Sequence, residues 1–299
     1  MSELTREQKG LRADEILKDP VKDRIEEVLD AYSLTIKEKP SVYLVTKPAI
    51  DWDQISVFFE EENVPPIPET VRAGNDESAA VVEISARMCY MSYGRGRKDI
   101  TDFINNLLNS KDGSVFEHVN YGFILTGVSR SLTHELVRHR AGFAYSQRSQ
   151  RYVDESEGSF VAPPIMASGQ PGFGQPREIL DDALEKAAES YKILVEELDK
   201  SLPREMFESR TDRRKAIRQA ARSVLPNATE TKIFVTANVR ALRHFIEMRG
   251  AVYADTEIRY VSIEMLKLLQ QEAPLLFQDF KIDNLPDGTQ IATPQYSKV

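Results

Sequence analysis

The stretch Phe116–Arg140, FEHVNYGFILTGVSRSLTHELVRHR, contains the pattern that decides the fold of this chain. Its segment VNYGFILT (119–126) is rich in aromatic and β-branched residues, which is typical of a strand. Ser129 follows at a position suited to a helix N-cap, and it opens the segment SRSLTHELVRHR. We therefore predict a strand that runs into a helix, and we expect the helix to end at Ala141-Gly142.

The segments on either side of this stretch predict an α/β protein of the α+β type, with a small mixed β-sheet flanked by many helices. Two further strands are predicted, at 41–50 and 231–237. Apolar spacing and capping residues predict the other helices, at 76–91 (capped by Asp76 or Asn75), 100–110, 177–202, 211–225, 238–249 and 255–273. Loops are expected at 64–75 and 154–176, where Pro, Gly and Ser gather.

Three parts of the chain are expected from these patterns. Residues 1–40 are predicted to be a charged helical N-terminal extension, and residues 41–281 the main domain. Residues 282–299 are polar and are expected to form a loose C-terminal tail.

The composition restricts the class of protein. The chain has 299 residues and a formal net charge of -8, with 41% hydrophobic and 29% charged residues, as in a soluble protein with a substantial core. An acidic balance argues against non-specific nucleic-acid binding, which needs a broad basic surface. No apolar run is long enough to span a membrane, and the charged N-terminus does not resemble a secretory signal.

A single cysteine, Cys89, cannot form an internal disulfide, which fits a reducing cytoplasm. Its neighbours in SARMCYMSY are largely apolar, so we expect a buried structural thiol rather than a reactive one.

A basic cluster stands out in this acidic chain: Arg138-His139-Arg140 and, soon after, Ser146–Tyr152. Arginine forks bind phosphate with two hydrogen bonds, so a small anionic ligand held by several groups is expected. A solvated helix face remains an equally good explanation for Arg130, His134 and Arg138, which are spaced four residues apart. The C-terminal helix dipole offers a structural reason for His139 and Arg140.

Other cofactor and metal motifs fit worse. His134-Glu135 resembles the start of HExxH, but the next histidine follows at i+5, off that helix face, so no metal site is predicted. Gly94-Arg95-Gly96-Arg97 lacks the third glycine of a dinucleotide fingerprint, and no P-loop is present. Any flavin or nicotinamide is therefore expected to bind without a Rossmann motif.

A second basic cluster lies further along the chain. Arg218 and Arg222 are four residues apart on a predicted helix, and so are Arg240 and His244 on the next. Asn238 is expected to cap that second helix, on which Arg249 projects only about 20° away from Asn238.

These residues carry a resemblance to the flavin-dependent thymidylate synthases (the ThyX family). The family signature, RHR then seven residues and S-x-R, reads here as RHRAGFAYSQRSQR. The concordant blocks cover roughly residues 41–280, and they are FEH (116–118), SRSLTHELVRHR (129–140), QAARSVLPNATET (219–231), NVRALRHFIEMR (238–249) and ADTEIR (254–259).

The resemblance implies a reaction and its cofactors. The enzyme methylates dUMP at C5 to give dTMP, with methylenetetrahydrofolate as carbon donor, NADPH as reductant and FAD as the mediating flavin. In this family no cysteine needs to attack the uracil ring, which agrees with a lone Cys89 outside the signature. A homotetramer with active sites assembled from several subunits is also implied.

The resemblance further implies roles for individual residues. The flavin contacts match Asn120, Arg138, His139, Arg140, Gln147, Asn238, Val239, Arg240 and His244. The nucleotide contacts match Glu135, Leu136, Val137, Arg138, Gln147, Arg148, Ser149, Gln150, Arg151, Arg222 and Arg249. Arg249 and Ser149 match the residues tied to catalysis. We expect Arg249 to stabilise charge at N3 of the uracil, and we interpret Ser149 as a substrate-binding hydroxyl because no general base is evident beside it.

The chain departs from the family pattern at one place. Eight residues, not seven, separate Arg140 from Ser149, and Ala144 replaces an additional serine. We expect the extra residue at Ala141-Gly142, where glycine permits a bulge. This departure leaves an alternative open, a related flavoenzyme that methylates another uracil nucleotide such as UMP. A non-catalytic phosphate-binding or RNA-binding protein is the third possibility.

Overall fold

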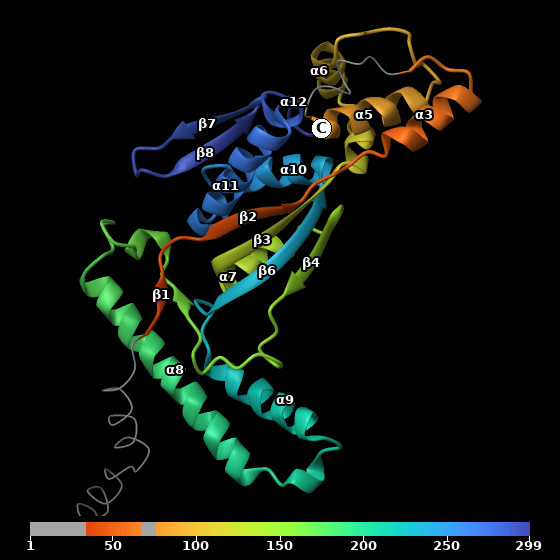
Figure 1. The fold of residues 1–299 in the computed structure, drawn as a ribbon. Coiled ribbons are helices and arrows are strands. Elements are labelled where there is room, and N and C mark those ends of the chain that lie inside the picture. The colour runs from red at the N-terminus through yellow and green to blue at the C-terminus, as the bar shows by residue number, and fades with distance from the viewer. Residues whose placement is uncertain (1–33, 67–75) are drawn as a thin grey trace, which may run out of the picture. The chain divides into compact units, whose positions relative to one another are not determined.

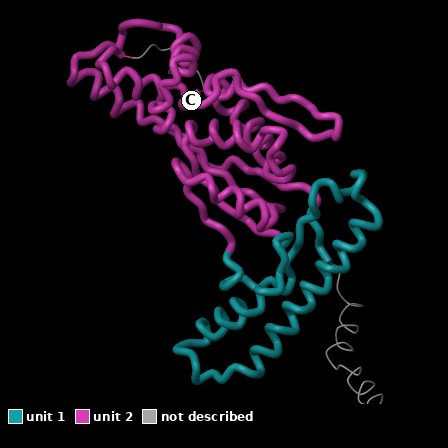
Figure 2. Tube along the Cα trace, turned by 180° about the vertical axis from the view of Figure 1, so that it is seen from behind, with its two compact units in different colours: residues 1–37, 149–229 teal, residues 38–148, 230–299 magenta. Residues whose placement is uncertain are grey.

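The computed structural model describes residues 34–66 and 76–299, which form two compact units (Figure 2). Unit 1 contains residues 149–229 and the described residues up to Lys37, and unit 2 contains the described residues from Glu38 to Arg148 and from Glu230 to Val299. The predicted N-terminal helix lies mostly outside the described residues. Its end does not follow the prediction, because Ile36–Lys37 (β1) form a strand. In the described part of the chain, no helix has the length and apolarity needed to cross a membrane.

Unit 2 is built on a four-stranded antiparallel sheet with the strand order β2-β3-β6-β4 (Figure 1). The strands are β2 (Ser41–Thr46), β3 (Asn120–Ser129), β4 (Phe143–Gln147) and β6 (Glu230–Asn238). Buried residues run almost without interruption along β3, as expected of a central strand, whereas they do not along the edge strand β4. The register pairs Asn120 with Asn238, so the start of β3 lies beside the end of β6.

Unit 2 also contains the helices α3 (Trp52–Glu61), α5 (Glu77–Met88), α6 (Ile100–Ser110), α7 (Arg130–Leu136), α10 (Val239–Arg249), α11 (Thr256–Glu272), α12 (Pro274–Phe277) and the 3₁₀ helix η1 (Gly113–His118). All of these except α3 contribute buried residues to the main hydrophobic core, and Phe59 of α3 belongs to a separate small cluster. The core joins Phe123 and Leu125 of β3 to Leu242 and Phe245 of α10 and to Leu266 of α11, all fully buried. Each such side chain contributes about 1.5–3 kcal/mol on burial, so the core holds α10 against the sheet.

Capping side chains fix where two helices begin. The Ser129 hydroxyl oxygen accepts the N–H of Leu132 at 3.0 Å at the start of α7, and the side-chain Oδ1 of Asn238 accepts the N–H of Ala241 at 2.9 Å at the start of α10. Glu257 of α11 accepts hydrogen bonds from the Ser129 N–H at 2.8 Å and its hydroxyl at 2.6 Å. Both predicted caps are confirmed, and Glu257 of α11 further fixes the position of Ser129.

The chain after α7 differs from the prediction. The helix ends at Leu136, so Arg138, His139 and Arg140 lie in the turn that follows it. His139 and Arg140 thus follow the C-terminus of the helix instead of forming its last turn, and Arg138 does not share a helix face with the residues before it. The segment 143–147, for which no strand was predicted, pairs with β6 as strand β4.

The region around Cys89 also differs from the prediction. Helix α5 begins after its predicted cap, Asp76, but it ends at Met88, short of Met91. Cys89 is the C-cap of this helix and is exposed, not buried as expected. The apolar neighbours in the sequence were misleading because the chain from Met88 to Met91 is exposed, directly after the buried Ala86 and Arg87.

Unit 1 consists mainly of two helices that pack together, α8 (Gln175–Ser201) and α9 (Arg210–Ala221), drawn in teal in Figure 2. The remaining elements are β5 (Phe160–Val161), η2 (Pro164–Met166), η3 (Arg204–Met206) and η4 (Arg222–Val224). β5 pairs in parallel with β1, and Phe160 packs on Leu184 and Ala188 of α8. The predicted fold class is confirmed, with the parallel pairing confined to this small sheet.

The C-terminal segment is ordered, contrary to the prediction of a loose tail. β7 (Phe280–Asn284) and β8 (Gln290–Pro294) form an antiparallel hairpin, and Ala292 and Val299 belong to the core. The turn between the strands contains Asp287-Gly288, with Gly288 at φ +80°. This pair is a turn signal that the overall polarity of the segment concealed.

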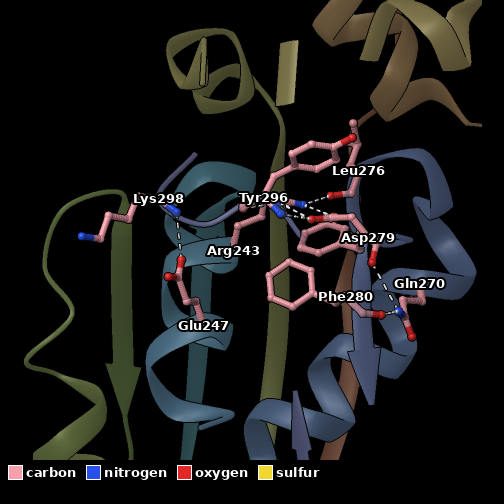
Figure 3. Close-up of polar contacts among 9 residues, drawn as sticks. Arg243, Glu247, Gln270, Leu276, Asp279, Phe280, Tyr296 and Lys298 are labelled. Atoms are coloured by element: carbon pink, nitrogen blue, oxygen red, sulfur yellow. Dashed lines mark hydrogen bonds and ion pairs between the residues drawn. The ribbon is translucent and has the colours of Figure 1, made fainter. Parts of the chain in front are cut away.

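A buried arginine joins this segment to α10 (Figure 3). Arg243 is 2% exposed, and its two terminal nitrogens donate to both carboxylate oxygens of Asp279, at 2.7 and 2.9 Å. The same nitrogens donate to the carbonyls of Leu276 at 2.6 Å and Tyr296 at 3.2 Å. One turn further, Glu247 accepts the N–H of Lys298 at 3.0 Å. The C-terminal segment is therefore fastened to α10 by charge-assisted hydrogen bonds.

Candidate active site

A short turn, Val137–Gly142, connects α7 to β4 and places the Arg138-His139-Arg140 triplet. It continues from the helix through the hydrogen bond from the N–H of His139 to the carbonyl of Leu136, at 3.1 Å. Gly142 ends the turn at φ +72°, a left-handed conformation that glycine adopts without strain. The Gly142 carbonyl accepts the N–H of Asn238 at 3.1 Å, so the turn rests on the start of α10.

Arg249, the last residue of α10, joins this turn to α7. Its Nη1 donates to Oε2 of Glu135 at 2.7 Å, and its Nε donates to Nε2 of His139 at 2.9 Å. The Arg249 and Glu135 side chains are 23% and 34% exposed, so the pair is only half-buried and can meet a ligand. Three residues from two blocks of the sequence, up to 114 positions apart, thus form one cluster.

His139 is held as a neutral ring in this cluster. Burial, together with the smaller effects of the charges of Arg249 and His244, lowers the pKa of His139 from 6.5 to about 4. Its ring packs edge-on against Phe245 at 5.1 Å between centroids. Nε2 accepts the Arg249 hydrogen bond and so carries no proton, which places the single ring proton on Nδ1 at neutral pH.

Exposed polar side chains border the same region of unit 2. Arg138 and Arg140 are exposed in the turn, and Asn120 is exposed at the start of β3. On α10, Arg240 and His244 are exposed one turn apart. Nη1 of Arg240 donates to Oε1 of Glu117 at 2.6 Å, but both side chains are about half exposed, at 47% and 50%, so solvent reaches the pair. The exposed guanidinium groups of this set are Arg138, Arg140 and Arg240.

Comparison with known proteins explains why these residues occur together. A family model described as thymidylate synthase complementing protein (Thy1) matches residues 71–275. The flavin-dependent thymidylate synthase of Mycobacterium tuberculosis H37Ra is 44% identical over 235 residues, which cover 77% of this chain and 89% of that protein. That of Mycolicibacterium vanbaalenii is 45% identical over 221 residues, 73% of this chain and 86% of that protein.

The chain belongs to the flavin-dependent thymidylate synthase family. The resemblance seen in the sequence is therefore confirmed, and so is the enzyme class, a flavin-dependent methyltransferase. The fold agrees with a solved structure, the UMP/dUMP methylase PolB of Streptomyces cacaoi bound with 5-Br UMP. The TM-score is 0.56 at 22% identity, over 82% of this chain and 95% of that one.

Some residues that match the family's ligand contacts have inward-facing side chains. Leu136 and Val239 are fully buried, and the Val239 N–H donates to the carbonyl of Val119 at 2.9 Å. Gln147 of β4 donates from its amide to the hydroxyls of Thr133 at 3.2 Å and Thr231 at 3.4 Å. The side chains of Leu136 and Val239 therefore serve the core, and Gln147 bridges α7 and β6.

Arg148, the last residue of unit 2 before unit 1 begins, is also engaged by the sheet. Its Nη2 donates to the backbone carbonyl of Glu230 at 2.9 Å and lies 3.7 Å from that residue's carboxylate. Its backbone N–H donates to the carbonyl of Lys232 at 2.9 Å. These bonds extend the β4–β6 pairing by one residue, and they give Arg148 a structural part that the family signature does not reveal.

The remaining predicted contacts lie in unit 1. Ser149 accepts the N–H of Arg151 at 3.3 Å through its hydroxyl oxygen, and the Arg151 side chain is exposed. Gln150 is 5% exposed, and its amide nitrogen has no hydrogen-bond partner among the described residues. Arg222 is the half-buried C-cap of α9. Within unit 1, Ser149 has a backbone group rather than a general base as its hydrogen-bond partner, which agrees with its interpretation as a binding hydroxyl.

Sequence reasoning missed two residues that shape the site. Glu117, which pairs with Arg240, was noted only as part of the FEH block, because an acidic residue before a strand gives no signal of a partner 123 residues away. Tyr145 was not singled out, yet its hydroxyl reaches two carbonyls of the turn. The alternation in FAYSQ (143–147) could have predicted that strand and the inward direction of its aromatic rings.

Proposed function

We propose that this enzyme methylates C5 of dUMP to give dTMP, with methylenetetrahydrofolate as one-carbon donor, NADPH as reductant and FAD as the flavin. The observation that carries the proposal is Arg249, which lies between Glu135 and His139 at 2.7 and 2.9 Å, each from a block that matches the family. A methylene group is two electrons more oxidised than a methyl group. One hydride equivalent from NADPH therefore completes the transfer, and the C5 hydrogen leaves as a proton.

The residues at the start of α10 fit the diphosphate of FAD. Arg138, Arg140 and Arg240 are exposed guanidinium groups, and such groups bind phosphate oxygens with paired hydrogen bonds. The N-terminus of α10 adds a positive helix dipole near Asn238. When bound there, FAD supplies hydride transfer and carries the one-carbon unit. Asn120 and His244 are the exposed groups that we expect to bind the rest of the flavin.

Arg249 is proposed as the group that stabilises negative charge on the uracil ring. A guanidinium fixed next to N3 and its neighbouring carbonyl oxygen favours the electron-rich ring that attacks the one-carbon unit, without any proton transfer. Nε and Nη1 of Arg249 are held by His139 and Glu135. Nη2 donates to no group in the part of the chain that the structure describes, and it is the atom that we assign to the nucleotide.

Glu135 and His139 orient Arg249 in different ways. The Glu135 carboxylate balances the guanidinium charge, and it also offers an acceptor to the sugar hydroxyls of a nucleotide. Neutral His139 accepts from Nε without adding a second positive charge beside Arg249, which its lowered pKa ensures at pH 7. Arg151 and Arg222 of unit 1 are proposed to bind a nucleotide phosphate, with Ser149 and Gln150 as further polar contacts of that unit. A homotetramer with shared active sites, and a cytoplasmic location, are part of the same proposal.

The longer turn bears on the choice between dUMP and UMP. Its glycine, Gly142, lies against Asn238 at the start of α10, and a Cβ atom built on it would come within 2.7 Å of the Asn238 amide nitrogen. The strand that follows pairs regularly with β6 from Phe143 to Gln147. Gly142 thus lies beside the proposed flavin groups, and the β4–β6 pairing is regular through Gln147. Membership of the flavin-dependent thymidylate synthase family supports dUMP as the substrate.

The decisive experiment is a turnover assay with the purified protein, FAD, methylenetetrahydrofolate and NADPH. We expect a yellow protein that forms dTMP, with dUMP preferred over UMP by a hundredfold or more, on the order of 3 kcal/mol. A similar rate with UMP supports the alternative methylase. A colourless protein that takes up no FAD and turns over neither nucleotide contradicts both, and salt-sensitive RNA binding then supports a non-catalytic protein.

A further inference from the structure

Tyr145 lies in the middle of β4 and points back to the turn before it. Its hydroxyl oxygen is 2.8 Å from the carbonyl oxygen of Leu136, the last residue of α7, and 2.5 Å from the carbonyl oxygen of His139. Both carbonyls belong to the stretch that carries the Arg138-His139-Arg140 triplet. One side chain from the neighbouring strand therefore spans the first half of the turn.

The surroundings keep the Tyr145 hydroxyl in place as a donor. Its ring stacks on Phe143, with centroids 5.7 Å apart and planes 13° from parallel. Burial raises the pKa of the Tyr145 phenol well above its usual range, so the group stays protonated at any pH the enzyme meets. Its proton is shared between the Leu136 and His139 carbonyls, because a hydroxyl has only one hydrogen to donate.

The turn has little else to hold its middle. The His139 N–H donates to the Leu136 carbonyl at 3.1 Å, and the N–H of Phe143 donates to the Arg140 carbonyl at 3.3 Å. Arg138 and Arg140 are exposed on either side of His139. The Tyr145 hydroxyl is therefore the side-chain group that fixes the peptide of His139, and through it the imidazole that accepts from Nε of Arg249 at 2.9 Å.

We propose that Tyr145 is a positioning residue of the active site: its hydroxyl holds the Leu136–His139 turn so that the His139 ring stays packed against Arg249. Neither the family signature nor the predicted contacts include this residue. The proposal deepens the proposed function, because the turn it fixes carries groups assigned to FAD and to Arg249. The claim that Tyr145 positions the His139 ring concerns the protein alone, so it can be tested without any ligand.

The test uses the ring of His139 as a reporter. The chain has only four histidines, so the full-length protein labelled with ¹³C at the histidine ring gives few signals. Substitution of His118, His134 and His244 in turn assigns the fourth. In the wild type we expect the pKa of His139 to lie near 4, because the ring is buried beside Arg249. In Tyr145→Phe the turn loosens, and the pKa of His139 should rise towards the ordinary value of about 6.5.

Tyr121→Phe is the matched control. Tyr121 is a fully buried tyrosine on β3 whose hydroxyl bonds to Ser78, and its loss should leave the pKa of His139 unchanged. A rise confined to Tyr145→Phe supports the proposal. A pKa near 4 in both variants, or an equal rise in both, overturns it, since the effect of Tyr145 is then absent or is general loosening of the core.

A wild-type measurement covers the case in which Tyr145→Phe does not fold. With ¹³C at the histidine carbonyl, exchange of the Tyr145 hydroxyl proton for deuterium should shift the carbonyl signal of His139. No shift contradicts the hydrogen bond and with it the proposal. Enzyme assays then distinguish a failure of the proposed function from a failure of the role assigned to Tyr145. If the wild type binds no FAD, the proposed function fails while the histidine titration still decides the role of Tyr145. If the wild type is active, Tyr145→Phe should weaken FAD binding at least tenfold, with Tyr121→Phe unchanged.

Discussion

Helix α10 carries two arginines, Arg243 and Arg249, that lie six residues apart and have different surroundings. Arg243 is 2% exposed, and its two terminal nitrogens donate to four oxygens of Leu276, Asp279 and Tyr296 (Figure 3). Arg249 is 23% exposed, and in the described part of the chain only its Nε and Nη1 donate to protein groups. Burial of the whole guanidinium with both terminal nitrogens bonded to protein oxygens marks a structural arginine, whereas a half-exposed arginine with one terminal nitrogen facing no protein acceptor can bind a ligand.

The largest effect should follow from removing Arg243. Arg243→Ala leaves the Asp279 carboxylate buried and unpaired, which costs about 3–5 kcal/mol of stability. Chemical denaturation of the full-length protein measures this loss. Arg240→Ala, on the same helix but with a half-exposed partner, serves as the control and should cost less than about 1 kcal/mol. Equal losses in both variants contradict the structural part assigned to Arg243.

The next effect concerns Arg249 and catalysis. Arg249→Ala should lower the rate of dTMP formation about 10²–10³-fold, the usual cost of losing one charge-stabilising group in an active site. Its stability should change little, because the Glu135 partner is 34% exposed and can be solvated. Flavin absorbance after gel filtration tells whether FAD stays bound. Loss of FAD in this variant means that Arg249 acts on the flavin rather than on the nucleotide.

The half-buried His139 ring beside Arg249 should also make the stability of the protein depend on pH. The pKa of His139 is about 4 in the folded protein and 6.5 when unfolded, so the unfolded chain binds more protons between these values. The contribution of neutral His139 is therefore complete above pH 6.5 and is lost as the pH falls towards 4. Between pH 7 and pH 4.5, the free energy of unfolding should fall by about 1–2 kcal/mol less in His139→Gln than in the wild type, after allowance for solvent screening. Chemical denaturation at the two pH values measures this difference. An identical pH dependence in the two proteins argues against a neutral, buried ring.

The smallest effect belongs to the ion pair between Arg240 and Glu117. Glu117→Gln removes a surface partner at 2.6 Å, and the free energy of unfolding should change by less than about 1 kcal/mol. If Arg240 binds the FAD diphosphate, release from Glu117 should leave FAD affinity equal or higher. Isothermal titration with FAD measures this, and a large loss of affinity shows that Glu117 itself orients Arg240 for the flavin.

The sequence predicted the elements whose signals are local. Ser129 and Asn238 mark the starts of α7 and α10 because a capping side chain acts within its own turn. The end of α7 was not predicted, since the bonds from the Tyr145 hydroxyl come from the next strand. The C-terminal hairpin was missed for a similar reason, because its order depends on Arg243, which is 36 residues from Asp279.

In the candidate site, too, local signals were predicted and contacts between distant residues were not. Family blocks in the sequence placed Glu135, His139 and Arg249 among the functional residues, but separately. Their meeting in one cluster joins positions 110 and 114 residues apart, which no spacing rule can supply. The extra turn residue was predicted at Ala141-Gly142 from glycine's backbone freedom, and Gly142 does adopt a left-handed φ of +72°. What that residue touches, the Asn238 amide, needed the structure.

The most direct test of the central claim is the visible spectrum of the purified protein with FAD, recorded before and after addition of dUMP. We expect flavin bands that shift on dUMP addition in the wild type, and the same bands without a shift in Arg249→Ala. A wild-type protein without flavin bands, or an equal dUMP-induced shift in Arg249→Ala, contradicts the assignment of Arg249, at the C-terminal end of α10, to the nucleotide.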